Sequence, residues 1–144
     1  MGQAREVMDR LTEAITITRD LKAAAECFAE DAVVVSPDEG EIRGRERIVE
    51  YWRHFMDAMP DASYEPLALY EDGDSAIDEG FMIGTNTGPL IGPDGERRAP
   101  TGRRIRARSC DRATVVDGHI VEHHIYFDRM DFLGQLGLLP EPNP

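Results

Sequence analysis

The sequence lacks a hydrophobic run long enough to cross a bilayer, and its first residues, Met-Gly-Gln-Ala-Arg-Glu-Val, lack the apolar core of a secretory signal. We therefore expect a soluble, cytoplasmic protein that does not bind membranes. Cysteine is also scarce. The two cysteines, Cys27 in a helical pattern and Cys110 on a strand, have no spacing typical of a metal site, so we expect free thiols and no disulfide.

Positive charge is in short supply: 16 Lys and Arg stand against 28 Asp and Glu, for a formal net charge of -12. Because nucleic-acid binding depends on cationic patches, this balance excludes nucleic acid as an expected partner. The sequence also has no Gly-rich phosphate loop and no serine nucleophile elbow. His123 and His124 are adjacent on a strand and point to opposite faces, so they are not a metal pair. We expect no metal and no cofactor.

The length of 144 residues and the hydrophobic fraction of 41% fit one domain, residues 1–144. Helical spacing comes first and period-two alternation comes last, which predicts an α+β fold with helices on one side of a curved antiparallel sheet. Expected helices run from about Arg5 to Thr16, from a cap at Asp20, and through a third stripe of Ile48, Trp52, Phe55 and Met59. Expected strands are Ala32–Ser36, Ser63–Tyr70, Ser75–Thr85, Arg103–Val115 and His119–Phe127.

Asp111 is the leading site candidate because its strand places a carboxylate on the face that should be dry. One face of this strand carries Arg104, Arg106, Arg108 and Arg112, and the other carries Ile105, Ala107, Ser109, Ala113 and Val115. Asp111 falls with the second set. An ionised carboxylate in an apolar layer is costly unless it is paired or hydrogen-bonded, so Asp111 should have a partner or a task.

The turn that follows decides which residue joins Asp111. A two-residue turn at Asp117-Gly118 would place Asp111 opposite His124. A three-residue turn that includes Val116 would place it opposite His123, and the apolar pattern of the last strand favours this second register. On that interpretation Asp111 and His123 form a cross-strand pair that can hold and pass a proton. A structural ion pair between two strands has equal weight.

Several other residues were weighed for the site. Trp52, Phe55 and Phe81 could line a pocket, and they would equally be ordinary core in a domain of this size. His54 is expected on the surface, and His119 lies in a solvated turn. The segment Gly88–Gly102, rich in Gly and Pro, is either part of a pocket mouth or a simple surface connection.

An ordered series of short motifs resembles SnoaL-like proteins, the polyketide or ester cyclase branch of the nuclear transport factor 2 (NTF2) superfold. The motifs are Gly40-Glu41-Ile42-Arg43-Gly44, Thr85-Asn86-Thr87-Gly88, Pro100-Thr101-Gly102-Arg103, Val116-Asp117-Gly118-His119-Ile120-Val121-Glu122, Tyr126-Phe127-Asp128 and Gln135-Leu136-Gly137-Leu138. The resemblance implies an NTF2-like conical barrel: a curved antiparallel sheet, three N-terminal helices and a short C-terminal helix around one deep apolar pocket. It also implies a capping role for Asp128.

Characterised cyclases of this family close a polyketide ring by cofactor-free aldol chemistry with an Asp and a His. Carried over by position, the family's His falls on Asp111 and its essential Asp falls on Ile125, while His123 matches a His of the family. The related ketosteroid isomerase pattern has its neutral Asp at Asp111 and its base at Ser36. Epoxide hydrolases of this fold would have an Arg at Ser109 and an Asp at Ile125.

These observations predict a SnoaL-like enzyme, a cyclase or isomerase that acts on a small apolar carbonyl compound through Asp111 and His123. The residues expected to contact substrate are Ser36, Trp52, Phe55, Phe81, Ile125 and Phe127. The alternative is a non-catalytic ligand-binding domain. The presence of Ile125 at the position of the family's essential Asp favours this alternative. Because sheets of this superfold commonly pair through their outer faces, the resemblance also implies a homodimer with the alternating Arg residues near the contact.

Overall fold

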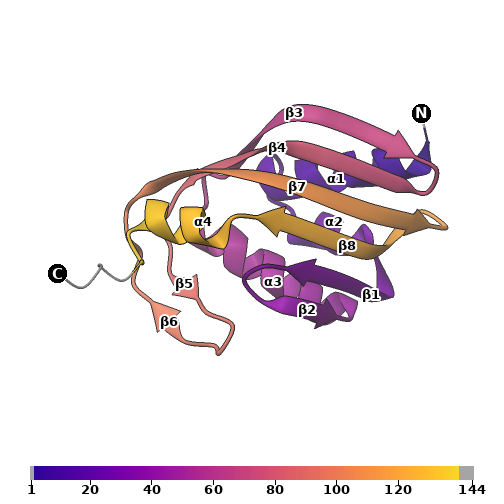
Figure 1. The fold of residues 1–144 in the computed structure, drawn as a ribbon. Helices are drawn as coiled ribbons and strands as arrows, with labels where there is room; N and C mark the ends of the chain where they lie inside the picture. The colour runs from indigo at the N-terminus through magenta and orange to yellow at the C-terminus, as the bar shows by residue number, and fades with distance from the viewer. Residues whose placement is uncertain (1, 140–144) are drawn as a thin grey trace.

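The computed structural model describes residues 2–139 and has the α+β architecture that the sequence predicts. Figure 1 shows one layer of strands with α1, α2 and α3 on one of its faces. The elements in chain order are α1 (Gln3–Thr16), α2 (Leu21–Glu26), β1 (Phe28–Ser36), β2 (Gly40–Arg43), α3 (Arg45–Ala58), β3 (Ser63–Asp72), β4 (Ser75–Thr85), β5 (Leu90–Ile91), β6 (Arg97–Arg98), β7 (Arg104–Val116), β8 (His119–Phe127) and α4 (Arg129–Leu136).

The main sheet has the order β2-β1-β8-β7-β4-β3. Its pairs are antiparallel except for β1 and β8, which run parallel, so the sheet is mixed where a wholly antiparallel one was expected. The first strand is parallel because it enters the sheet beside the last strand of the meander instead of joining it through a hairpin. The edge strands β2 and β3 are not paired with each other, and the curved sheet is therefore not closed as a barrel.

The helix ends explain where the expected and observed elements differ. The Asp20 side chain accepts a hydrogen bond from Ala23 N at 3.1 Å, which caps α2 as predicted. That helix ends at Glu26, and Phe28 begins β1, where it is fully buried. The Asp128 side chain accepts from Asp131 N at 3.1 Å and caps α4, in agreement with the role that the resemblance implied.

Strand β3 supplies the cap of α1. The helix has no side-chain cap of its own, and Glu71 of β3 accepts hydrogen bonds from Gly2 N and Arg5 N, each at 2.7 Å. These contacts satisfy amides that a helix start leaves without partners. They also lower the pKa of Glu71, with the Arg5 amide as the main cause. The edge of the sheet and the first helix are thereby held together.

The turn between β7 and β8 corrects the predicted register. Asp117 and Gly118 have φ of 51° and 80°, the geometry of a two-residue type I′ turn, and Val116 pairs with His119. A bulge then leaves Val121 without a partner, so Asp111 lies opposite Ile125 and not opposite His123. The three-residue turn was wrong. The shorter turn and the bulge each shift the register by one residue. Because two such shifts restore the alternation of side chains, His123 still points to the buried face.

Asn86 holds the long connection between β4 and β7 in place. Its side chain is fully buried, donates to Ala58 O at 3.0 Å and Gly88 O at 2.9 Å, and accepts from the amide and hydroxyl of Thr101 at 2.7 and 3.0 Å. Gly88 is required beside it, because a Cβ there would lie 1.8 Å from Asp57 O. Asn86 therefore fixes both ends of the loop that carries β5 and β6.

We expect Asn86→Ala to lower the free energy of unfolding by at least about 2 kcal/mol, because it leaves several buried donors and acceptors without partners at about 1–3 kcal/mol each. Urea unfolding followed by circular dichroism measures this change. Thr87→Ala, at an exposed position of the same loop, is the matched control and should change the value by less than about 0.5 kcal/mol. Equal effects of the two substitutions would contradict the role given to Asn86.

Candidate functional site

Asp111 of β7 and His123 of β8 contact each other on the buried face of the sheet. His123 Nε2 lies 3.1 Å from Asp111 Oδ2, although the two residues are diagonal neighbours and not directly opposed. The side chain of His123 is 1% exposed and that of Asp111 is 23% exposed, so solvent reaches the carboxyl but not the ring. An ionised carboxylate only accepts hydrogen bonds, so Nε2 carries the hydrogen in that state.

Aromatic rings hold His123 in position. The Trp52 ring stacks on it at a centroid distance of 6.2 Å and an angle of 22°, and Phe28 lies 6.3 Å away. His123 Nδ1 and Trp52 Nε1 are both buried and have no hydrogen-bond partner among the described residues. The contact with Asp111 is therefore the polar interaction that orients this imidazole.

Asp78, which no sequence pattern indicated as a site residue, lies directly opposite Asp111 in the β4–β7 register. Its side chain is 6% exposed and forms an ion pair with Arg5 of α1, at 2.6 Å between Nη2 and Oδ1. The contact is close without being a well-aligned hydrogen bond. Burial raises the pKa of Asp78 above its ordinary value, Arg5 opposes this shift, and the charge of Asp111 adds to it.

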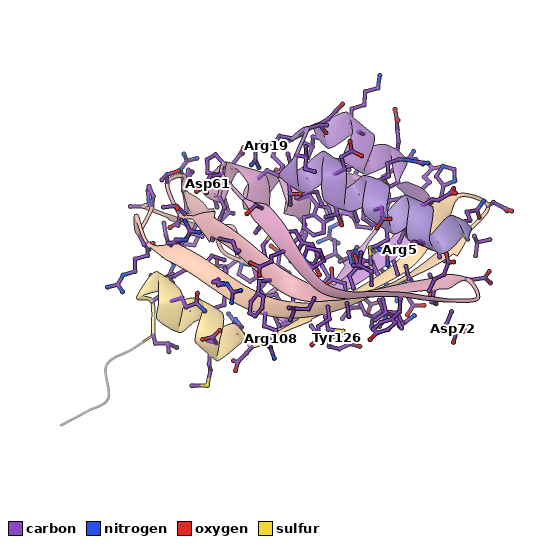
Figure 2. All side chains as sticks on the ribbon, turned by 90° about the horizontal axis from the view of Figure 1, so that it is seen from above. Arg5, Arg19, Asp61, Asp72, Arg108 and Tyr126 are labelled. Carbon is purple, nitrogen blue, oxygen red and sulfur yellow. The ribbon has the colours of Figure 1, made fainter. Side chains whose placement is uncertain are left out.

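Figure 2 shows the two sides of the sheet: Arg5 lies between α1 and the strands, whereas Arg108 and Tyr126 lie on the opposite side. Besides Asp78, Arg5 binds Asp9 and donates to Tyr70 O at 3.2 Å. The guanidinium of Arg5 therefore contacts groups of its own helix, of the edge strand β3 and of the buried face of β4. A polar residue within the apolar spacing of the first helix was the available sequence signal for this contact.

Tyr64 of β3 covers the carboxylates on the inner face. Gly80 of β4 lies close to the end of this ring, and a Cβ there would lie 2.7 Å from the Tyr64 hydroxyl and 2.5 Å from Glu65 O. Burial, followed by the charges of Asp78 and Asp111, raises the pKa of Tyr64 well above its ordinary value. The phenol therefore stays neutral at any physiological pH.

We expect Arg5→Met to lower the free energy of unfolding by about 3–5 kcal/mol at pH 7, because it leaves Asp78 buried without a cation. In this variant the folded protein holds a proton on Asp78 that the unfolded chain releases above pH 3.8. The free energy of unfolding of the variant therefore falls as the pH rises, and its deficit relative to the unchanged protein becomes smaller in acid. Urea unfolding between pH 4 and pH 8, as round working limits, measures both effects.

Arg53→Met is the control for this prediction, since Arg53 pairs with Glu50 while both side chains are about half exposed. An exposed ion pair contributes at most about 1 kcal/mol. A loss in Arg5→Met that is as small, or that grows as the pH falls, would contradict the account of the buried pair.

A cavity of about 520 Å³ lies between α3, the β5–β6 hairpin, α4 and the turn that joins β1 to β2. Its apolar lining includes Phe55, Met59, Leu90, Phe132 and Leu136. The segment Gly88–Gly102 therefore contributes to a pocket wall, which was one of the two expectations for it. His54, expected on the surface, is half-buried, lines the cavity and lies 3.0 Å from Glu50 Oε1.

The described cavity lining does not include Asp111 or His123, so the expectation that this pair forms its wall is not met. Helix α3 separates the two places: Tyr51 lines the cavity, and its neighbour Trp52 stacks on His123. The Tyr51 and Trp52 rings contact each other edge to face at 5.2 Å. The cavity and the Asp111–His123 pair are neighbours joined through these two rings.

The residues expected to contact substrate are distributed unevenly. Phe55 lines the cavity, and Phe127 packs at 5.5 Å against Phe132, which also lines it. Ser36 and Ile125 are buried on the inner side but do not belong to the described lining.

Phe81 points away from both places, contrary to the sequence-based expectation. It lies on the outer face of the sheet, where the guanidinium carbons of Arg106 and Arg108 are 3.6 and 5.1 Å from its ring centroid. The alternation in β4 was misleading here: the larger apolar residues Ile77 and Phe81 face outward, while Asp78 faces inward.

A family model described as a SnoaL-like domain matches residues 6–123, and the chain therefore belongs to the SnoaL-like family. No protein in the curated set matches the sequence significantly. Within residues 2–139, no helix is long and apolar enough to span a membrane.

Solved structures of SnoaL-like and NTF2-like proteins share this fold. IdmH of Streptomyces antibioticus, described as a candidate polyketide cyclase, is 28% identical, with a TM-score of 0.76 over 94% of this chain and 99% of its own. A candidate SnoaL-like polyketide cyclase from Jannaschia sp. CCS1 is 16% identical, with a TM-score of 0.82 over 96% and 94%. AclR of Streptomyces galilaeus, a candidate hydroxylase, is 23% identical, with a TM-score of 0.78 over 95% and 97%.

Proposed function

We propose that the protein is a cofactor-free acid/base enzyme that acts on a small apolar carbonyl compound, as a cyclase or an isomerase. The observation that carries the proposal is the 3.1 Å contact between His123 Nε2 and Asp111 Oδ2 on the inner face of a SnoaL-like domain. The similarity of this chain to IdmH, which is described as a candidate polyketide cyclase, supports the substrate class. The cavity beside the pair has room for a small molecule.

The chemistry follows from the two side chains. Asp111 as a carboxylate takes a proton from the carbon next to a carbonyl group, and the C–H electron pair forms an enolate. The His123 N–H stabilises the charge that develops near Asp111. In a cyclase the enolate carbon then bonds to a second carbonyl carbon, and the resulting alkoxide takes the proton back from Asp111. In an isomerase the proton returns to a different carbon.

Proton exchange at carbon tests the proposal without the natural substrate. In D2O the protein should speed the exchange of the α-hydrogens of 1-tetralone, an aromatic ketone, as followed by proton NMR. Asp111→Asn should slow this exchange by about 100-fold or more, because general acid/base catalysis contributes about 10²–10⁴-fold. Binding of 2-naphthol, measured by its fluorescence, should change by less than about threefold, since the amide keeps the shape of the side chain.

Asp74→Asn, on an exposed turn, is the matched control and should leave exchange unchanged. If Asp111→Asn exchanges the ketone as fast as the unchanged protein does, Asp111 is not the base.

A second candidate function is non-catalytic binding of a small ligand. Two observations favour it: Ile125, directly opposite Asp111, cannot move a proton, and the pair lies outside the described cavity lining. Binding of 2-naphthol with no exchange of 1-tetralone above the buffer rate would support this function over the enzyme.

We also propose that the protein acts in the cytoplasm as a homodimer that pairs through the outer face of the sheet. This face carries the half-buried Ile77, Phe81 and Ile83, larger apolar residues than the inner Ala76 and Gly80 of the same strand. Among the described residues, the chain's helices α1, α2 and α3 cover the other face. A second copy of the chain would remove the outer residues from water.

Phe81→Asp should convert the dimer into a monomer in analytical ultracentrifugation at micromolar concentration, because it places a carboxylate in the apolar contact. Ile17→Asp makes the same type of change at an exposed position after α1 and should leave the dimer intact. A monomeric unchanged protein, or a dimeric Phe81→Asp variant, would contradict this assembly.

A further inference from the structure

The cavity has a polar end that the Asp111–His123 pair does not explain. Asp38 and Glu39, in the turn between β1 and β2, are half-buried and line the cavity together with Tyr51 of α3. The Tyr51 hydroxyl lies 3.3 Å from Asp38 Oδ1. Two carboxyl groups and a phenol therefore meet at one wall of an otherwise apolar space.

The free hydrogen-bond donors and acceptors of this polar end determine which ligand group it can bind. A phenol has one hydrogen, and Tyr51 donates it to Asp38. The Ser36 hydroxyl lies beside the Tyr51 oxygen and donates to it, which opposes the rise in the pKa of the phenol. The groups that remain are the second lone pair of the Tyr51 oxygen and the oxygens of the two carboxyl groups, which accept hydrogen bonds when ionised. Burial, with the Asp38 charge as the next cause, keeps the pKa of Tyr51 well above its ordinary value, so the phenol stays neutral. A carbonyl oxygen would face mainly acceptors among the described residues of this end.

The charge of this end is also negative. Burial raises the pKa of Glu39 above its ordinary value, and the charge of Asp38 adds to the shift, while His54 and Arg47 oppose it. His54 already contacts Glu50, and Arg47 is exposed. The basic groups on the other walls, Arg98 and Arg129, are exposed, and Arg98 lies 4.0 Å from Glu96. Among residues 2–139, Asp38 and Glu39 thus have no buried cation beside them.

We propose that the cavity binds an apolar molecule that carries a protonated amine, with the ammonium group between Asp38 and Glu39 and against the Tyr51 oxygen. The ammonium supplies three donors to a wall of acceptors and neutralises part of its charge. Phe55, Leu90, Phe132 and Leu136 contact the apolar body. The inference narrows the substrate class of the proposed enzyme to amine-bearing compounds. It rests on one part of the proposed function, that the cavity binds a small molecule, and it does not require Asp111 to be the catalytic base.

Three naphthalene compounds of similar size test the inference: the cation of 2-(1-naphthyl)ethylamine, the neutral 2-(1-naphthyl)ethanol and the anion 1-naphthaleneacetate. Their dissociation constants are measured by naphthalene fluorescence at pH 7 with the full chain. The amine should bind about tenfold more tightly than the alcohol, as a partly buried charge-assisted hydrogen bond predicts, and the acetate should bind most weakly. Equal binding of amine and alcohol, tighter binding of the acetate, or binding of none of the three would overturn the inference.

Substitutions locate the preference. Asp38→Asn and Glu39→Gln keep the side-chain shape and should each reduce the ratio of amine to alcohol affinity at least about threefold, because each removes one negative charge. Asp94→Asn, on an exposed part of the rim, is the matched control and should leave the ratio unchanged. An unchanged ratio in both Asp38→Asn and Glu39→Gln would also overturn the inference.

The outcome is separable from that of the proposed enzyme. Asp111→Asn should keep the amine preference while it loses exchange of 1-tetralone. Loss of exchange in Asp38→Asn without a change in amine preference would count against the amine site and leave the role of Asp111 intact. Loss of the amine preference in Asp111→Asn alone would place the ammonium at the wrong end of the interior.

Discussion

Two aspartates face each other across β4 and β7 on the buried side of the sheet, and the interior is arranged around their charge. Asp78 is balanced by Arg5, which α1 delivers through the helix layer, and Asp111 is balanced by the imidazole of His123. Without these partners, the two neighbouring carboxylates would repel each other. The first helix, the edge strand that caps it and the last hairpin are therefore parts of one electrostatic arrangement.

Helix α3 divides the interior into two chemical environments. Its Trp52 packs on the ring of His123, and its Tyr51 turns toward the cavity and contacts Asp38. One environment pairs an acid with a base, and the other presents acceptors at the end of an apolar space. A molecule that spans both would need an acidic C–H bond at one end and a hydrogen-bond donor at the other.

The three N-terminal helices and the strands β1, β3, β4, β7 and β8 could be predicted from the sequence, because the apolar spacing is clear in each and changes from helical to alternating after Pro60. The strands β2, β5 and β6 were not predicted, since two to four residues carry too little periodic signal. The limits of β4 and β8 and the cap at Asp20 were correct, since each has a local signal. The cap at Asp128 was also correct, and it came from the family resemblance. The parallel pairing of β1 with β8 depends on residues about 90 positions apart, as the partners Val34 and His123 show, and no local pattern encodes it.

The site was predicted in part for the same physical reason. Alternation identified the buried face of Asp111, but the shorter turn and the bulge at Val121 each moved its partner by one residue, from His123 to Ile125. The contact with His123 survived because both side chains stay on one face. Asp78 was missed, and Phe81 was predicted on the wrong face, because β4 places Ile77 and Phe81 outward and Asp78 inward. A large apolar side chain on a strand is equally typical of a protein core and of a contact surface between proteins, and the spacing in a single sequence is the same for both.

The most direct test of the account is a crystal structure of the protein with 2-naphthol, whose phenolic oxygen imitates an enolate. The account predicts this oxygen within about 3.2 Å of Asp111 or of His123 Nε2, with the rings toward the cavity. A well-ordered ligand whose oxygen lies away from both side chains would contradict the claim that they move the proton.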